Sequence, residues 1–572
     1  MVQAARTAND PIQGTPTGAG SAAWITRFSN PLDGGKGGLL AGLRFAVKDN
    51  IDVRGWYTTA GCEAFAYRPE RHATVVQRLL DAGASLLGKT NLDQFACGLN
   101  GTRSPFGAVP NAFNGAYVSG GSSSGSAYVV ATGQVDFALG TDTASSGRVP
   151  AGLNNIVGLK PSRGLVSAFG VVPAAQSVDC VSIFAATSGL AARVLETCGH
   201  FDPADPFARR VTLKSQPYAT PLRFGVPSEL EFFGDLQSEL AFALAVRRLE
   251  KLGGVPVRID FAPLRRAAAL LYESALVAER YAAIRPFFDQ QAQAIIEPVR
   301  SIIASGCNYS AADLFEAQTK LRAIAQEVAG LWDGVDVLLV PTAPTHYTIA
   351  QMLADPVVLN RNLGAYTNFV NLLDFAALSV PSSMRADGLP FGVTLIGPCG
   401  SDWQLAELGE RYHRSTGLTA GSTGLPLPPA VPVAGIRPAA SIRVAVVGAH
   451  LSGMPLNGQL TQRGARLVQT TTTSAHYRLY ALPGTVPPKP GLLRLSGAEP
   501  GECIAVEVWE MPLAQFGSFV ALVAQPLCIG TLTLVDGSTV QGFLCEAHAL
   551  QDAPDVTRFG GWREYTSSLA AS

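Results

Sequence analysis

The sequence predicts an α/β fold in which helices sandwich a mixed β-sheet, followed by a small β-rich α+β domain. Three observations lead to this prediction. Helical stripes alternate with short apolar strands over most of the chain, the proline-rich run Gly424 to Pro438 then interrupts them, and strand-like segments dominate the remainder. We therefore expect a large domain at 1–423 with a flexible stretch at 1–20, a linker at 424–440 and a second domain at 441–572.

In the large domain, apolar alternation at residues 43–47 predicts a strand that ends at Lys48. A helical stripe is expected over 240–249 and ends at two glycines, and a short strand follows at 255–257. The stripe consists of Leu240, Leu244, Val246 and Leu249. The run Val337 to Val340, closed by a proline, predicts a buried strand.

A further helical run begins at Pro263 and includes the segment 272–281. Its apolar residues are Leu264, Leu270, Leu271 and Leu276. Tyr272 and Arg280 are eight residues apart on this predicted helix, which separates them by a rise of about 12 Å and a rotation of about 80°. Both side chains could then reach one pocket only through their length.

The second domain is predicted from strands at 444–447, 478–482 and 504–509 and from a hairpin that turns at Asp536-Gly537. The preceding linker is too proline-rich for a helix and suits an extended, semi-rigid conformation.

Composition excludes several classes of function. A net charge of −1 over 572 residues argues against nucleic-acid and membrane-surface binding, and no long apolar span or signal peptide is apparent. The nine cysteines form no C-x-x-C pair, which favours reduced thiols over a disulfide framework or a zinc site. We expect a cytoplasmic protein without metal or cofactor.

Two serine clusters carry the chemistry. Residues 120–126 read Gly-Gly-Ser-Ser-Ser-Gly-Ser, and residues 141–150 read Thr-Asp-Thr-Ala-Ser-Ser-Gly-Arg-Val-Pro. Such runs are often flexible linkers. The first also fits a nucleophile elbow centred on Ser123, but that motif needs an apolar strand before it, and residues 111–119 are polar. The glycine-rich segment 34–38 is not predicted to bind phosphate, because it lacks the spacing of a Walker motif.

A serine hydroxyl needs a base to become a nucleophile at neutral pH. None of the seven histidines lies in the serine-rich region, so the neutral amine of Lys48 is the natural substitute. Burial must then bring the pKa of Lys48 down from about 10.4 toward neutrality.

The V-K-D-N segment around Lys48 and the two serine clusters resemble the motifs of the amidase signature hydrolases, and the similarity runs from about residue 30 to 400. The resemblance implies that Lys48 draws a proton through Ser122, which follows a cis peptide bond, and that Ser146 is the nucleophile. It implies an oxyanion hole formed by successive backbone amides. These amides would be those of Thr143, Ala144, Ser145 and Ser146.

One position departs from the family pattern. The family has glycine immediately before the nucleophile, whereas this chain has Ser145. If the glycine serves a positive φ or a close approach of the substrate, a Cβ there would narrow the pocket or tilt a donor N–H. A low-activity variant is therefore an open alternative.

The segment Tyr-Glu-x-x-x-Val-Ala-Glu-Arg-Tyr at 272–281 looks like that of allophanate hydrolases, in which the Tyr and Arg hold the substrate. Tyr272 and Arg280 inherit these roles, and an arginine fork suits a carboxylate. The second domain resembles their C-terminal domain, which looks like the γ-glutamylcyclotransferase group, above all at 448–457. His450 is the candidate there for binding or proton delivery, and a purely structural histidine is an equal alternative.

The resemblance implies hydrolysis of allophanate to ammonia and carbon dioxide. The first domain would form N-carboxycarbamate, and the second would assist its decarboxylation. It also implies a homodimer and coupling to a urea carboxylase. Two alternatives stay open: another amidase of the same family, acting on biuret, urethanes, aryl amides or as a glutamyl-tRNA amidotransferase A-like subunit, and a silent family member that serves as a scaffold.

Overall fold

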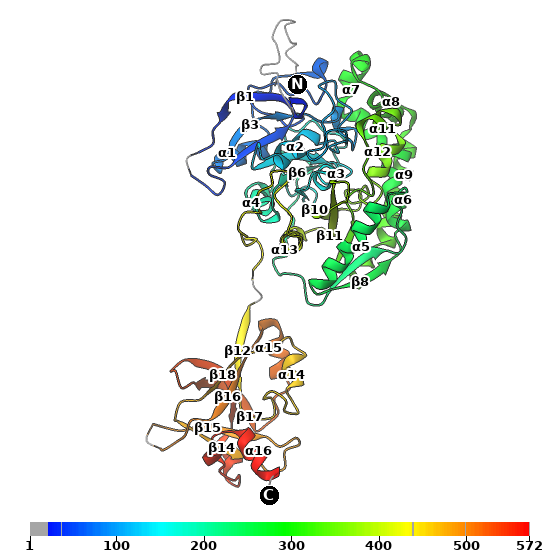
Figure 1. Ribbon diagram of the computed structural model, residues 1–572. Helices are drawn as coiled ribbons and strands as arrows, with labels where there is room; N and C mark the ends of the chain where they lie inside the picture. Colours follow the sequence, from blue (N-terminus) through cyan, green and yellow to red (C-terminus); the bar gives the residue numbers. More distant parts are fainter. Residues whose placement is uncertain (1–20, 36, 438–439, 498, 571–572) are drawn as a thin grey trace. The chain divides into compact units, whose positions relative to one another are not determined.

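The computed structural model describes residues 21–35, 37–437, 440–497 and 499–570. These residues form two compact units, one ending at Arg437 and one following it (Figure 1). The predicted flexibility of residues 1–20 falls outside the described residues. Within the described ranges, no helix is long and apolar enough to cross a membrane.

The first unit is built on one 11-stranded mixed sheet, which confirms the predicted fold class. Its strands, in order across the sheet, are β1 (Trp24–Leu32), β3 (Ser85–Thr90), β2 (Arg44–Lys48), β4 (Phe137–Asp142), β6 (Cys180–Ala185), β5 (Val157–Lys160), β10 (Phe375–Met384), β11 (Pro390–Pro398), β9 (Val337–Pro341), β7 (Leu222–Pro227) and β8 (Gly254–Ile259). β2 runs parallel to β3 and β4, whereas the strands from β4 to β9 pair antiparallel.

Helices cover both faces of this sheet (Figure 1). They are α1 (Thr74–Asp81), α2 (Ser124–Ala131), α3 (Val149–Leu153), α4 (Ser188–Cys198), α5 (Leu236–Lys251), α6 (Ala262–Glu273), α7 (Ala278–Gln291), α8 (Val299–Ala304), α9 (Ala311–Glu327), α10 (Leu331–Gly334), α11 (Ile349–Ala354), α12 (Val358–Leu363) and α13 (Asp402–Arg414). Because side chains alternate along a strand, Phe137 and Leu139 of β4 enter the core beneath α1 and α4, while Ala138 packs against α2.

β2, β8 and β9 form where the sequence predicts strands, and α5 forms where it predicts a helix. The buried face of α5 differs from the predicted stripe. Leu240 and Leu244 are exposed, whereas Ala241, Phe242 and Ala245 contact the sheet. The small residues let α5 lie close to the strands, so the leucines one position away along the chain turn outward.

The long helix predicted from Pro263 is wrong, because it is interrupted. α6 ends at Glu273, Ser274 is extended, with φ −144° and ψ 177°, and a short 3-10 turn η4 (Ala275–Val277) leads into α7. The Ser274 hydroxyl donates to the Leu270 carbonyl at 2.5 Å and accepts from the Leu276 amide at 3.3 Å. A serine that bonds local backbone in this way competes with the helical pattern.

The second unit has its own core and its own sheets. A 5-stranded sheet runs in the order β13 (Arg466–Thr472), β16 (Ala505–Pro512), β12 (Ser441–Val446), β18 (Thr539–Cys545) and β17 (Leu527–Thr533). A separate hairpin consists of β14 (Tyr477–Ala481) and β15 (Pro490–Arg494), and the helices are α14 (Gly458–Thr461), α15 (Leu513–Val520) and α16 (Trp562–Ala570). The predicted turn at Asp536-Gly537 joins β17 to β18, and the unit has the predicted small, β-rich α+β character.

Candidate active site

Two neighbouring parallel strands bring the predicted base beside the second serine cluster. Lys48 ends β2, and Thr141 and Asp142 end β4, so both chain segments leave the sheet at the same edge. Ser122 lies two residues before the start of α2, after a cis Gly121–Ser122 peptide bond. The side chains of Lys48 and Ser122 are fully buried.

The Lys48 ammonium lies 2.7 Å from both the Ser122 Oγ and the Thr141 Oγ1, to which it donates. Burial lowers the pKa of Lys48 to about 7, against the opposing charges of Asp93, Asp179 and Asp142. A lysine with this pKa is neutral in about half of the molecules near pH 7 and can accept a proton there.

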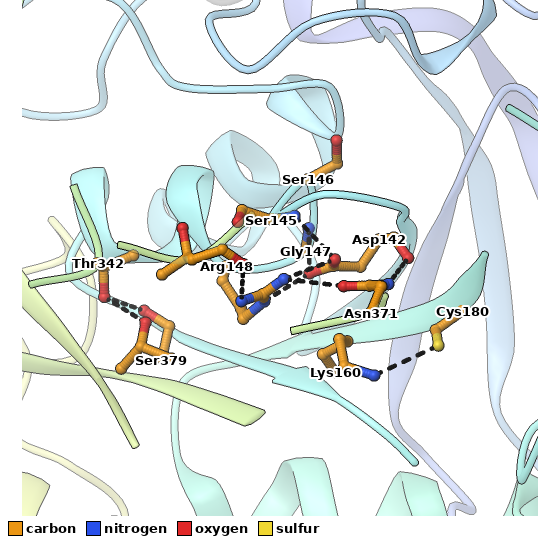
Figure 2. A network of polar contacts seen from close by, with 12 residues as sticks. Asp142, Ser145, Ser146, Gly147, Arg148, Lys160, Cys180, Thr342, Asn371 and Ser379 are labelled. Atoms are coloured by element: carbon orange, nitrogen blue, oxygen red, sulfur yellow. Dashed lines mark hydrogen bonds and ion pairs between the residues drawn. The ribbon is translucent and has the colours of Figure 1, made fainter. Parts of the chain in front are cut away.

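A buried ion pair shapes the turn that carries Ser146 (Figure 2). The Asp142 carboxylate accepts two hydrogen bonds from Arg148, at 2.8 and 2.9 Å, and two from backbone amides, those of Ser145 at 2.9 Å and Gly147 at 3.0 Å. Burial alone would raise the pKa of Asp142, but the charges of Arg148 and Lys160 and the hydrogen bonds from Arg148 and Ser145 together outweigh it and hold this pKa below its usual value. With every oxygen paired, the carboxylate fixes the turn.

Asn371 also stabilises this turn, through hydrogen bonds to Asp142 and Arg148 (Figure 2). Its Nδ2 donates to the Asp142 carbonyl at 2.6 Å, and its Oδ1 accepts from Arg148 at 3.1 Å. On the other side, the Thr143 hydroxyl donates to Asp179 at 2.5 Å. Desolvation raises the pKa of Asp179 to about 6, so this carboxylate titrates close to physiological pH.

The predicted oxyanion hole needs one correction. The Ser145 amide donates to Asp142 and is therefore not free for a substrate. In the described part of the chain, the amides of Thr143, Ala144 and Ser146 donate to no protein acceptor. Ser145 has φ +84°, and its buried hydroxyl has no hydrogen-bond partner among the described residues. The expected positive φ is therefore present, with a serine side chain on it.

Ser146 donates its hydroxyl hydrogen bond to the Gly98 carbonyl, at 3.4 Å. Across the described ranges, no hydrogen bond joins Ser122 to Ser146, so the second link of the expected relay is not formed in this arrangement. The Ser146 hydroxyl must give up its hydrogen bond to the Gly98 carbonyl before it can donate its proton elsewhere.

The loop that carries Gly98 is held from two sides, and sequence reasoning missed both anchors. The Asp93 carboxylate accepts from the amides of Asn100, Gly101 and Arg103 at 3.2, 3.1 and 2.9 Å. Asn360 of α12 accepts from the Leu99 amide and from the Asn100 Nδ2, both at 2.8 Å. No local motif marks this role, because Asn360 is far away in the sequence.

Tyr272 and Arg280 come from different helices and meet beside the nucleophile turn. The Arg280 Cζ lies 5.5 Å from the centre of the Tyr272 ring, and Tyr272 packs in one apolar cluster with Ala144. The Arg280 side chain is only 4% exposed, yet its Nε and Nη1 have no hydrogen-bond partner in the described residues. A buried guanidinium with free donors is a ready anion site.

His450 lies in the second unit and lines a pocket together with Lys489 and Phe543. Its Nε2 lies 2.9 Å from the Gln459 Oε1, and its ring stacks on Phe543 with a centroid separation of 4.9 Å. Burial lowers the pKa of His450, so the ring is neutral near pH 7.

Ser123, the centre of the alternative nucleophile elbow, is not placed as a nucleophile. Its Oγ is buried and donates to the Thr141 carbonyl at 3.1 Å. Among the residues that the structure describes, no group of three or more His, Cys, Asp or Glu could hold a metal ion.

Comparisons with known proteins find similarity over most of the chain. A family model described as amidase matches residues 21–406, and one described as the allophanate hydrolase C-terminal domain matches residues 442–567. A solved structure of Kluyveromyces lactis allophanate hydrolase is 42% identical, covers 93% of this chain and 89% of that chain, and superposes with a TM-score of 0.75.

Two curated relatives match different lengths of the chain. The urea amidolyase of Saccharomyces cerevisiae is 45% identical over 545 residues, which are 93% of this chain but only 30% of that protein. A glutamyl-tRNA(Gln) amidotransferase subunit from Thiobacillus denitrificans is 35% identical over 420 residues, 67% of this chain and 86% of that protein. The chain thus spans about a third of the urea amidolyase that it matches.

Proposed function

The chain belongs to the amidase family and carries an allophanate hydrolase C-terminal domain, and from this premise we propose that it hydrolyses allophanate to ammonia and carbon dioxide. The observation that carries the choice of substrate is Arg280, whose buried guanidinium offers unpaired donors beside the nucleophile turn. Allophanate is a urea with a carboxylate on one nitrogen. That carboxylate matches the arginine fork, and the proposal is that the terminal amide of the bound allophanate is the group attacked by Ser146.

In the proposed reaction, Ser146 Oγ attacks the terminal amide carbonyl as its proton passes to Ser122 and the Ser122 proton passes to neutral Lys48. The oxyanion is held by the amides of Thr143, Ala144 and Ser146. The relay returns a proton to the leaving nitrogen, which departs as ammonia and leaves an ester on Ser146. Water then attacks this ester, with Lys48 again as the base, and releases N-carboxycarbamate.

For the second unit we propose assistance in the decarboxylation of N-carboxycarbamate, with His450 as the group that binds or protonates it. Lys489 lines the same pocket and offers an ammonium group to a carboxylate, which supports the binding role. The alternative is a histidine that only stacks on Phe543 and bonds Gln459. His450→Asn separates them, because it should slow carbon dioxide release without changing release of the first ammonia. Unchanged carbon dioxide release favours the structural alternative.

The deciding assay is ammonia release from allophanate by purified protein. Ser146→Ala should abolish the activity above background, and equal rates in the two proteins would reject Ser146 as nucleophile. Arg280→Ala should mainly raise KM by removing the carboxylate anchor, whereas Arg280→Lys keeps the charge but loses the fork. An unchanged KM in Arg280→Ala would reject the carboxylate contact.

A substrate panel tests the alternative amidases. The relation to a glutamyl-tRNA(Gln) amidotransferase makes a glutamine-dependent transamidase the second candidate, and hydrolysis of glutamine or simple aryl amides in preference to allophanate would favour it. We also propose a cytoplasmic location and functional coupling to a urea carboxylase, which supplies allophanate. The coupling is supported by the similarity to a urea amidolyase.

A further inference from the structure

The segment 174–179, here called the spacer turn, contacts both parts of the proposed substrate site. It directly precedes β6 and is closed by its last residue. The Asp179 carboxylate accepts from the Ala174 amide at 2.8 Å, and the Asp179 amide donates to the Ala175 carbonyl at 2.9 Å. Side-chain bonds of this kind to nearby backbone hold a turn in one conformation. The spacer turn is therefore a compact unit that can set the separation of its neighbours.

On one side, the spacer turn is bonded to the nucleophile turn, residues 142–148. The Thr143 hydroxyl donates to Asp179 at 2.5 Å, and Thr143 also supplies one of the amides proposed to hold the oxyanion. The Asn371 Nδ2 donates to the Val178 carbonyl at 3.0 Å as well as to the Asp142 carbonyl. One buried apolar cluster also contains side chains of both turns, namely Ala144, Ala175 and Val178. Hydrogen bonds and packing thus hold the two turns together.

On the other side, Glu279 joins the spacer turn to α7. Its Oε1 accepts from the Ser177 amide and its Oε2 from the Ser177 hydroxyl, both at 2.7 Å. Hydrogen bonds to a carboxylate are strong, and two of them to one residue leave little freedom of rotation. Glu279 lies in the first turn of α7, directly before Arg280. The backbone that carries Arg280 is therefore tied to the spacer turn.

We propose that Glu279 is a positioning residue that selects the length of the substrate, because it fixes, through the spacer turn, the distance between Arg280 and the oxyanion amides. This role of Glu279 rests on the proposed function, in which Arg280 holds the substrate carboxylate. In allophanate, a single nitrogen separates the carboxylate carbon from the carbonyl carbon that is attacked. A fixed separation of the two binding groups admits amides of this length and disfavours longer ones.

The contact and the charge of Glu279 are separated by two substitutions. Because Glu279 adjoins Arg280 in the chain, its charge also acts on the guanidinium. Glu279→Gln removes the charge but can keep both bonds, since its Oε1 accepts from the Ser177 amide and its Nε2 donates to the Ser177 hydroxyl. Glu279→Ala removes charge and contact together. Glu273→Ala is the matched control, because Glu273 at the end of α6 is exposed and has no side-chain hydrogen bond in the described part of the chain.

The measurement is the inhibition constant of two carboxylated amides in the hydrolysis of allophanate. Malonamate has the length of allophanate, with CH₂ in place of N–H, and succinamate is longer by one CH₂. The unmodified protein should bind malonamate about tenfold more tightly than succinamate. Glu279→Ala should reduce this preference by about fivefold, whereas Glu279→Gln and Glu273→Ala should retain it. A general loss of stability would weaken the binding of both compounds alike and would leave their ratio unchanged.

Malonamide, which lacks the carboxylate, tests the proposed function separately. If malonamate binds no better than malonamide, Arg280 is not a carboxylate anchor and the role of Glu279 falls with it. If malonamate binds better than malonamide but the length preference is absent, or is unchanged in Glu279→Ala, only the role of Glu279 is overturned. An equal loss of the preference in Glu279→Ala and Glu279→Gln would assign the effect to charge and would also overturn the positioning role.

Discussion

Ser145 combines two unfavourable features at a position beside the nucleophile. Its backbone is in the left-handed region at φ +84°, and its buried hydroxyl lacks a partner in the described structure. A Cβ in this region costs about 1–2 kcal/mol, and a buried hydroxyl without a hydrogen bond adds about 1–3 kcal/mol. The four hydrogen bonds of the Asp142 carboxylate hold the turn in this conformation.

Ser145→Gly should therefore stabilise the first unit, by about 1 kcal/mol after allowance for the greater freedom of glycine in the unfolded chain. Ser145→Ala separates the two causes, because it removes the hydroxyl and keeps the Cβ. Thermal unfolding measures both variants. A Gly variant no more stable than the Ala variant would show that the positive φ carries no cost. Comparison of kcat/KM for the three proteins then shows whether Ser145 limits activity.

The pH dependence should follow Lys48. Its neutral amine is the proposed base, so kcat/KM should rise with pH through about 7 and level off above. Lys48→Arg, which stays charged, should lower kcat/KM by about 10²- to 10⁴-fold. Asp179→Asn keeps an acceptor for the Thr143 hydroxyl but removes a negative charge that stabilises protonated Lys48. The pKa of Lys48 should therefore fall, and the increase of kcat/KM should move to lower pH. A rise that stays in place in this variant would argue against Lys48 as the titrating group.

At the scale of elements, the loop from Asp93 to Arg103 shows how a distant helix controls the nucleophile. Phe95 and Ala96 have φ +52° and +54°, so the loop is held in a strained conformation that brings the Gly98 carbonyl to Ser146. Asn360 supplies one of its two anchors from α12, through an oxygen that accepts both hydrogen bonds. We therefore regard Asn360 as a positioning residue.

Asn360→Ala should lower kcat by about tenfold to a hundredfold, because it loosens the loop whose Asp93 amide donates to the Ser122 carbonyl at 3.1 Å and so misplaces Ser122. Asn360→Asp keeps the accepting oxygen and should restore most of the activity, since both hydrogen bonds to the loop are accepted by the Asn360 Oδ1. Steady-state kinetics on allophanate measures both. Equal loss in the two variants would point to a general loss of packing instead.

The sequence predicts those parts of the site whose residues lie close together along the chain. Lys48 lies at the end of a short alternating strand, and both serine clusters are continuous strings. Contacts between segments that are far apart in the chain leave no local sequence pattern. The sequence therefore predicts neither the hydrogen bonds from Asn360 to the loop nor those from Asn371 to the nucleophile turn. The break at Ser274 is not predicted either, because serine also occurs inside helices and the sequence does not show that its hydroxyl bonds the Leu270 carbonyl and the Leu276 amide here.

At the scale of the whole molecule, the described residues contain separate apolar cores. Leu195 belongs to the main core of the first unit, and Leu479 belongs to the core of the second, and both side chains are fully buried. Because each unit has a buried core of its own, each unit should unfold as its own cooperative transition.

Calorimetry of the full chain should accordingly show two transitions. Leu479→Ala removes a buried side chain from the second core, which costs about 2–5 kcal/mol, and should lower only one transition by several degrees. Leu195→Ala is the matched substitution in the first core and should lower only the other. If each substitution shifted both transitions, or if a single transition were found, the two units would be thermodynamically coupled. Since a separately folded first unit would retain its whole Lys48, Ser122 and Ser146 arrangement, Leu479→Ala should leave release of the first ammonia unchanged at temperatures where only the second unit has unfolded.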